Sequence, residues 1–164
     1  MMKKRWLSLY VENNIGVLAK ISGLFAGKNY NLNSLTVGTT NDITVSRMTI
    51  SLTSSDELFE QIKKQLNRLV EIIKVVDLTD LDVMIKELLF IKVKNYTSEE
   101  RNEIFQTASV FNAKVCDYGR SSILLETTAS YEKNNQLILL MGQYKDIEIV
   151  RSGAVAIEAC DKTE

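Results

Sequence analysis

Residues 11–35 read VENNIGVLAKISGLFAGKNYNLNSL, and the spacing of apolar residues changes within this stretch. Just before it and at its first residue, Leu7, Leu9 and Val11 alternate with other residues, which predicts a strand. After the polar loop the spacing becomes that of a helix packed on a sheet, with an inward stripe formed by Val17, Leu18, Ile21, Leu24 and Phe25. The stretch therefore predicts a strand, a polar loop and a helix.

The following residues complete one α+β unit. Asn29 can adopt the left-handed conformation that ends a helix, so the helix is expected to stop there. Two β-rich runs flank TTND at 39–42, which predicts a hairpin. Residues 54–70 predict a second helix, capped by Ser54 or Ser55, with an inward stripe of Leu58, Ile62, Leu66 and Leu69. With a strand over 71–78, the order is βαββαβ, a ferredoxin-like unit.

The same order recurs after the acidic stretch TDLD at 79–82. The predicted elements are a strand over 86–94, a capped helix over 98–111, two strands that meet at Tyr118–Gly119, a helix over 132–144 and a strand over 146–159 broken at Gly153. The fold class is therefore α+β, with two ferredoxin-like βαββαβ units, residues 1–79 and 80–164. Each half is small for a stable core, so a shared sheet or a dimer is expected.

Composition limits the possible partners. The 164 residues carry a net charge of −1 and are 45% apolar, and no basic patch suggests a nucleic-acid partner. The sequence contains no run of 18 apolar residues, so we expect no membrane-spanning helix. The N-terminus lacks the features of a signal peptide, so we expect a cytoplasmic protein. Cys116 and Cys160 have no metal-type spacing and are interpreted as buried or incidental thiols rather than a disulfide.

The search for catalytic chemistry gives a negative result. The chain has no histidine, the commonest general base and transition-metal ligand. The glycines at 16, 23 and 27 do not have the spacing of a phosphate-binding loop, and GLFAG at 23–27 is interpreted as close packing. Asp77, Asp80 and Asp82 lack the remaining parts of a calcium loop. We therefore expect no catalytic residue, no metal site and no cofactor bound by this chain.

The loop before the first helix has two interpretations. A helix start presents unpaired N–H groups and partial positive charge, so it can bind an anion. Asparagine is also among the best N-cap residues, so Asn13 and Asn14 could simply cap the helix. The loop alone favours the cap.

Longer motifs favour the ligand site. The run 11–37, followed by SRMTI at 46–50 and EQIKKQL at 60–66, resembles the regulatory small subunits of acetolactate synthase, also called acetohydroxyacid synthase. The resemblance covers the N-terminal unit almost continuously and extends more loosely to VRSG at 150–153, which on sequence grounds alone is a bulge. It implies an N-terminal ACT domain that binds valine or another branched-chain amino acid at a dimer interface.

The resemblance carries over four ligand residues: Asn13 and Gly16 in the loop, Asn31 after the helix and Gln61 on the second helix. In physical terms, the N–H groups from Ile15 to Leu18 can receive the ligand carboxylate, and Gly16 allows close approach. The full predicted valine site comprises Asn13, Asn14, Ile15, Gly16, Val17, Leu18, Asn31 and Gln61. Without the resemblance, Asn31 is a turn asparagine and Gln61 a solvated helix residue.

The chain departs from common family members at two positions. Asn29 stands where glycine is usual, and Ile43 where a proline often lies in the hairpin. Both residue types at 29 suit a left-handed helix end, and position 43 lies outside the ligand loop.

The family implies a non-catalytic chain that activates a large catalytic subunit carrying thiamine diphosphate, magnesium and FAD, and that confers valine inhibition. A homodimer through ACT domains is implied as well. Two alternatives remain: an amino-acid-sensing module that serves another partner, such as a transcriptional regulator, and a small enzyme. The missing basic segment argues against direct DNA contact, and the missing catalytic groups argue against the enzyme.

Overall fold

The computed structural model describes residues 1–28 and 30–160, which form two compact units. The first consists of Met1–Met84 and the described residues from Ala154 onward, and the second of Ile85–Gly153. The expected division after residue 79 stays a prediction. By their contacts, residues up to Met84 and the segment that begins at Ala154 group with the first unit.

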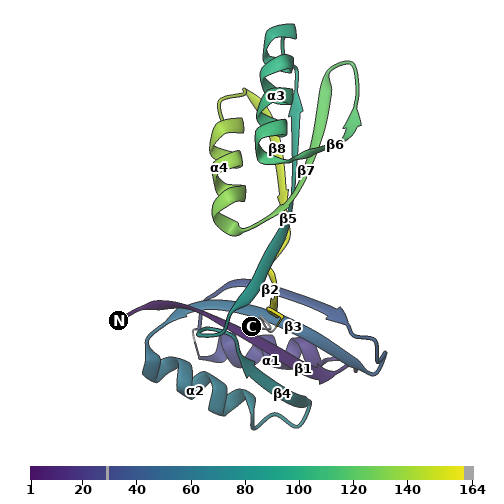
Figure 1. Ribbon diagram of the computed structural model, residues 1–164. Helices are drawn as coiled ribbons and strands as arrows, with labels where there is room; N and C mark the ends of the chain where they lie inside the picture. The colour runs from purple at the N-terminus through teal and green to yellow at the C-terminus, as the bar shows by residue number, and fades with distance from the viewer. Residues whose placement is uncertain (29, 161–164) are drawn as a thin grey trace. The chain divides into compact units, whose positions relative to one another are not determined.

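The first unit is a βαββαβ sandwich of one sheet and two helices, as predicted (Figure 1). Its antiparallel sheet has the order β2-β3-β1-β4, so the two edge strands are β2 and β4. Both helices contribute side chains to one core with the central strands. The elements are β1 Lys3–Glu12, α1 Val17–Gly27, β2 Leu32–Thr39, β3 Val45–Ser54, α2 Asp56–Leu66 and β4 Ile72–Asp77.

The buried face of α1 is narrower than the predicted stripe. Val17, Ile21 and Phe25 are buried at a spacing of four, and Leu24 is partly buried. Leu18 was predicted to point inward, but it is 44% exposed, so this prediction is wrong. One position further round the helix, Leu18 lies beyond the face that the sheet covers. The prediction for Asn29 lies outside the described residues.

The start of α2 follows the prediction more closely. Ser55 Oγ accepts a hydrogen bond from Leu58 N–H at 3.3 Å, so Ser55 is the N-cap. Ile62 and Leu66 of the predicted stripe are fully buried. Leu58 was predicted to lie in the buried stripe but is only partly buried, and the neighbouring Phe59 is buried instead.

The second unit repeats the topology, with the sheet order β6-β7-β5-β8. The α+β prediction with two ferredoxin-like units is therefore confirmed. β6 and β7 meet at Gly119, whose N–H bonds the carbonyl of Ser122 at 2.8 Å. The elements are β5 Val83–Lys94, α3 Ser98–Phe111, β6 Lys114–Tyr118, β7 Ser122–Ala129, α4 Tyr131–Met141 and β8 Asp146–Arg151.

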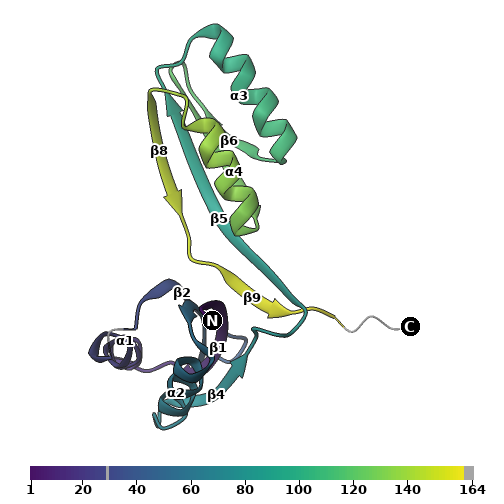
Figure 2. The same ribbon diagram turned by 90° about the vertical axis from the view of Figure 1, so that its left-hand side faces the viewer.

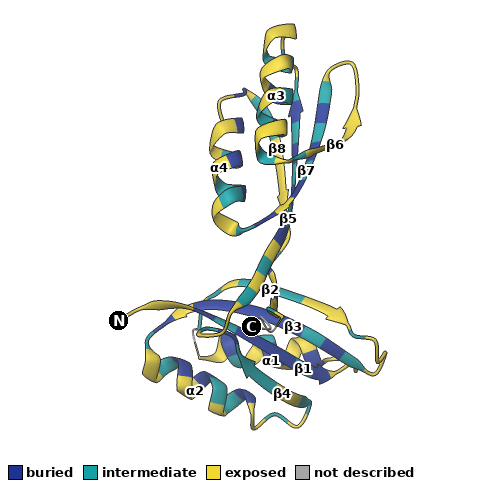
Figure 3. Ribbon diagram, viewed as in Figure 1, coloured by how far each residue is buried: buried dark blue, intermediate teal, exposed yellow. Residues whose placement is uncertain are grey.

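The predicted break at Gly153 is also confirmed, and the chain continues as β9, Val155–Glu158, which pairs with β5 (Figure 2). The segment around β9 bonds to the first unit: Ala154 O accepts from Thr36 Oγ1 at 2.6 Å, and Ala156 O accepts from Arg47 Nη2 at 2.9 Å. In Figure 3, buried residues of the first unit concentrate in the central strands β1 and β3.

Candidate ligand-binding site

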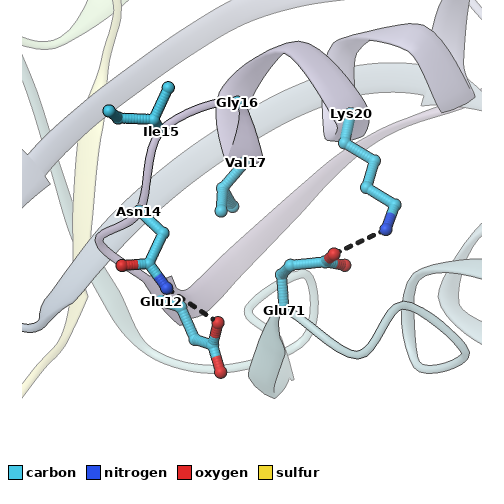
Figure 4. Close-up of a pocket in the computed structure, with 7 residues that line it drawn as sticks. All are labelled: Glu12, Asn14, Ile15, Gly16, Val17, Lys20 and Glu71. Atoms are coloured by element: carbon cyan, nitrogen blue, oxygen red, sulfur yellow. Dashed lines mark hydrogen bonds and ion pairs between the residues drawn. The ribbon is translucent and has the colours of Figure 1, made fainter.

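A pocket of about 280 Å³ lies where β1 ends and α1 begins (Figure 4). The chain runs from the end of β1 through the polar loop into α1, and β4 starts beside it, because Glu12 N–H donates to the carbonyl of Glu71 at 2.9 Å. The lining residues come from all three segments: Glu12, Asn14, Ile15, Gly16, Val17, Lys20 and Glu71.

The N-terminus of α1 opens on this pocket without a side-chain cap. Its N-cap is Gly16, with φ 86° and ψ −10°, a left-handed conformation that favours glycine. No acidic residue lies in its first turn. Among the described helices, α2, α3 and α4 instead begin with hydroxyl caps, Ser55, Thr97 and Ser130, and each has an acid in its first turn. The positive end of α1 is therefore available to an anion.

The two loop asparagines do not cap the helix, so the cap interpretation is wrong. Asn13 Nδ2 donates to the carbonyl of Ile43 at 2.8 Å, and its Oδ1 accepts from Ser46 Oγ at 3.0 Å. Asn14 Nδ2 donates to Glu12 Oε2 at 3.1 Å. Asn13 thus holds the loop to the hairpin, and Asn14 orients a carboxylate at the pocket.

The predicted residues divide into two groups in the single chain. Asn14, Ile15, Gly16 and Val17 line the pocket. The other four do not: Asn13 faces the hairpin, Leu18 is exposed on α1, Asn31 is exposed just before β2, and Gln61 is exposed on α2. The structure therefore gathers four of the eight predicted residues, all from the loop and the start of α1, and leaves the other four outside the pocket.

The three charged residues of the pocket, Glu12, Lys20 and Glu71, were not predicted from the sequence. Lys20 Nζ lies 2.5 Å from Glu71 Oε1, and this ion pair joins α1 to the start of β4. The hydrogen bond from Lys20 holds the pKa of the Glu71 carboxyl below its ordinary value. The ferredoxin-like order puts β1 beside β4, so fold-level reasoning could have placed Glu12 near Glu71.

The VRSG motif at 150–153 ends β8 with a polar network rather than a simple bulge. Arg151 Nε donates to Glu87 Oε1 at 2.8 Å, its Nη2 also bonds this oxygen, and Asn134 Nδ2 donates to it at 3.2 Å. The N–H of Ser152 donates to the carbonyl of Leu88 at 2.9 Å, and the N–H of Leu88 donates to Ser152 Oγ at 2.9 Å. The motif fixes the end of the strand just before the chain leaves the second unit.

Within residues 1–28 and 30–160, no three acidic or cysteine side chains gather to form a possible metal site. None of the helices in this part of the chain is long and apolar enough to cross a membrane.

Comparison with known proteins identifies both units. The model of the AHAS small subunit-like ACT domain matches residues 7–74, and that of the small subunit of acetolactate synthase matches residues 86–160. The probable acetolactate synthase small subunit of Archaeoglobus fulgidus is 42% identical over 94% of this chain and 96% of its own length. The acetolactate synthase small subunit of Aquifex aeolicus is 38% identical over 95% of this chain and 81% of its own.

A solved structure agrees with these matches. The crystal structure of the acetolactate synthase small subunit from Thermotoga maritima aligns with a TM-score of 0.88 at 33% identity, covering 97% of this chain and 99% of that one. The fold is thus that of an ACT-type protein with a second ferredoxin-like unit. The chain belongs to the acetolactate synthase small-subunit family.

Proposed function

We propose that this chain is the regulatory subunit of an acetolactate synthase, which activates the catalytic subunit and makes it sensitive to valine. Family membership supports the regulatory role. The catalytic subunit would carry the thiamine diphosphate, magnesium and FAD, and would condense two pyruvates, or pyruvate with 2-oxobutyrate. This chain would contribute no catalytic group.

The observation that carries the valine site is the uncapped, left-handed start of α1, which opens on the pocket at Gly16. The N–H of Val17 already donates to the carbonyl of Asn14 at 3.3 Å. A ligand carboxylate placed there would accept hydrogen bonds from neighbouring N–H groups at the helix start and interact favourably with the helix dipole. Ile15 and Val17 supply apolar surface beside it for a branched side chain.

A second copy of the chain would complete this site. β2 is an edge strand, and its end at Thr39 lies at the same end of the sheet as the loop, because Thr39 pairs with Ser46 and Glu12 with Val45. Antiparallel pairing of two β2 strands would therefore bring the start of β2 in one copy, with its Asn31, toward the loop of the other. This arrangement accounts for the position of Asn31 outside the pocket of a single chain.

A ligand shared by two copies can act on the catalytic subunit by favouring one arrangement of the dimer. Only a difference in affinity between two states shifts their populations. Typical couplings of about 1–3 kcal/mol change an affinity by about 5- to 150-fold. The second unit, with the VRSG network at its end, is the candidate for the activating contact.

The test is acetolactate formation by the catalytic subunit of the same organism, alone and with this chain, during a valine titration. Activation that valine reverses is the expected result. Activation without a valine response would leave the regulatory role and remove the ligand assignment. No effect of saturating chain on the enzyme would favour an amino-acid sensor that serves another partner.

A further inference from the structure

An α-amino acid has two charges, and the start of α1 accounts for only the carboxylate. The ammonium group requires an anionic or carbonyl acceptor on the same pocket. Two carboxylates line it, those of Glu12 and Glu71. One oxygen of Glu12, Oε2, already accepts a hydrogen bond from Asn14.

Glu71 has unused capacity to accept hydrogen bonds. Its carbonyl is fixed by the N–H of Glu12, so its side chain starts from a defined point at the edge of the pocket. Oε1 pairs with Lys20, whereas Oε2 is buried and has no hydrogen-bond partner among the described residues. An ionised carboxylate has about four acceptor positions. A buried carboxylate oxygen without a partner is unfavourable, so a turn of the carboxylate that brings this oxygen to a donor of a ligand in the pocket would gain affinity.

Lys20 is placed to hold Glu71 until a ligand arrives. It lies one turn into α1, where its N–H bonds the carbonyl of Gly16, and about half of its side chain is exposed. An ion pair between partly exposed side chains contributes little to stability, so replacing its cation by another costs little. Figure 4 shows the two side chains reaching toward each other from α1 and from the start of β4.

We propose that the Glu71 carboxylate turns toward the pocket to bind the α-ammonium group of the amino-acid ligand, in exchange for the ammonium of Lys20. This inference rests on the proposed valine site and adds the residue that distinguishes amino acids from simple carboxylic acids. The ligand carboxylate then lies at the helix start and its ammonium at β4. The bound ligand links the same two elements that the ion pair joins in its absence.

The test compares valine with 3-methylbutanoate, which has the same side chain and carboxylate but no ammonium group. Binding to the full chain is measured by isothermal titration calorimetry. Glu71→Gln is expected to lower the affinity for valine about tenfold to a hundredfold, which corresponds to the loss of a hydrogen bond between charged groups. It should leave 3-methylbutanoate unchanged. Lys20→Gln is expected to tighten valine, because the ligand no longer competes with the lysine.

Glu12→Gln is the matched control, since it removes the same charge from the same pocket. An equal loss of valine affinity in Glu12→Gln and Glu71→Gln would overturn the inference, because the pocket's general field would then be the cause. Wild-type valine affinity in Glu71→Gln, or weaker binding in Lys20→Gln, would overturn it as well. If valine fails to bind the wild-type chain at all, the proposed valine site fails instead.

Discussion

The side-chain amide of Asn13 donates to the carbonyl of Ile43, 2.8 Å away, and so ties the end of β1 to the hairpin between β2 and β3. The same side chain accepts from Ser46. A proline at position 43 would keep the carbonyl that Asn13 uses. The loop is therefore positioned by Asn13, whatever the residue contributes to the ligand.

Asn13→Ala is expected to lower the free energy of unfolding by about 1 kcal/mol, since one exposed and one partly buried hydrogen bond are lost. Urea denaturation measures the change. Valine should also bind more weakly, because the loop that carries Gly16 loses its attachment. Asn31→Ala is the control and should leave stability unchanged. A loss of valine binding in Asn13→Ala without any loss of stability would instead indicate direct ligand contact.

Gly16→Asp should abolish inhibition by valine while activation of the catalytic subunit persists. The new carboxylate would occupy the place of the ligand's, and a side chain at φ 86° costs about 1–2 kcal/mol. No atom lies within 4 Å of a Cβ at this position, so no steric clash within the chain contributes. Activity assays with and without valine measure the effect.

Gly16→Asn separates charge from volume, because asparagine tolerates the left-handed conformation and is neutral. It should remain measurably inhibitable. A Gly16→Asp variant as sensitive to valine as the wild type would contradict the proposed position of the carboxylate.

The Lys20–Glu71 ion pair predicts a pH dependence of stability. The folded pKa of Glu71 is lowered, so the contribution of the pair is present above the ordinary glutamate pKa and is lost as the pH falls through the lowered one. The melting temperature of Lys20→Gln should therefore lie slightly below that of the wild type at about pH 7, and the difference should shrink as the pH falls through the lowered pKa of Glu71. Lys28→Gln, at the far end of α1, should show no such trend. A difference that persists in acid would exclude the ion pair as its cause.

Val37→Lys should dissociate the proposed dimer. Val37 is 48% exposed on the edge strand β2, and a lysine on an edge strand opposes pairing with another chain. Sedimentation velocity measures the oligomeric state. Ile73→Lys is the matched control, since Ile73 is similarly exposed on β4, the other edge of the same sheet. If only the control dissociates the dimer, the copies pair through β4.

Arg151→Met is expected to destabilise the second unit by about 3–5 kcal/mol, the usual effect of removing one partner of a buried ion pair. The Glu87 side chain is only 5% exposed and would lose its cation. Adding Glu87→Leu should recover much of the loss, because a buried ion pair is readily replaced by apolar side chains. Thermal unfolding of the single and double variants tests this, and equal stability of the two would show that the ion pair is not the source of the effect.

Local pattern was sufficient to predict most of the elements. α3 spans 98–111, the predicted range, since Thr97 and Glu100 form a capping box that marks its start. The spacing of apolar residues alone wrongly predicted that Leu18 points inward, because the width of the buried face depends on how the helix lies on the sheet. Lys20 and Glu71 are brought together only by the β1–β4 neighbourhood, and a search for isolated motifs does not combine residues so far apart.

The return of the chain at Ala154 has a consequence for how the protein is made. Thr36 and Arg47 donate to the carbonyls of Ala154 and Ala156, which leave the ribosome only after the whole second unit has been synthesised. N-terminal domains generally fold first during translation, yet this one must wait for its last segment to complete its hydrogen bonds. A fragment that stops at residue 79 therefore lacks acceptors that the finished unit uses. A single proteolytic cut near residue 84 would leave the two units joined through Gly153.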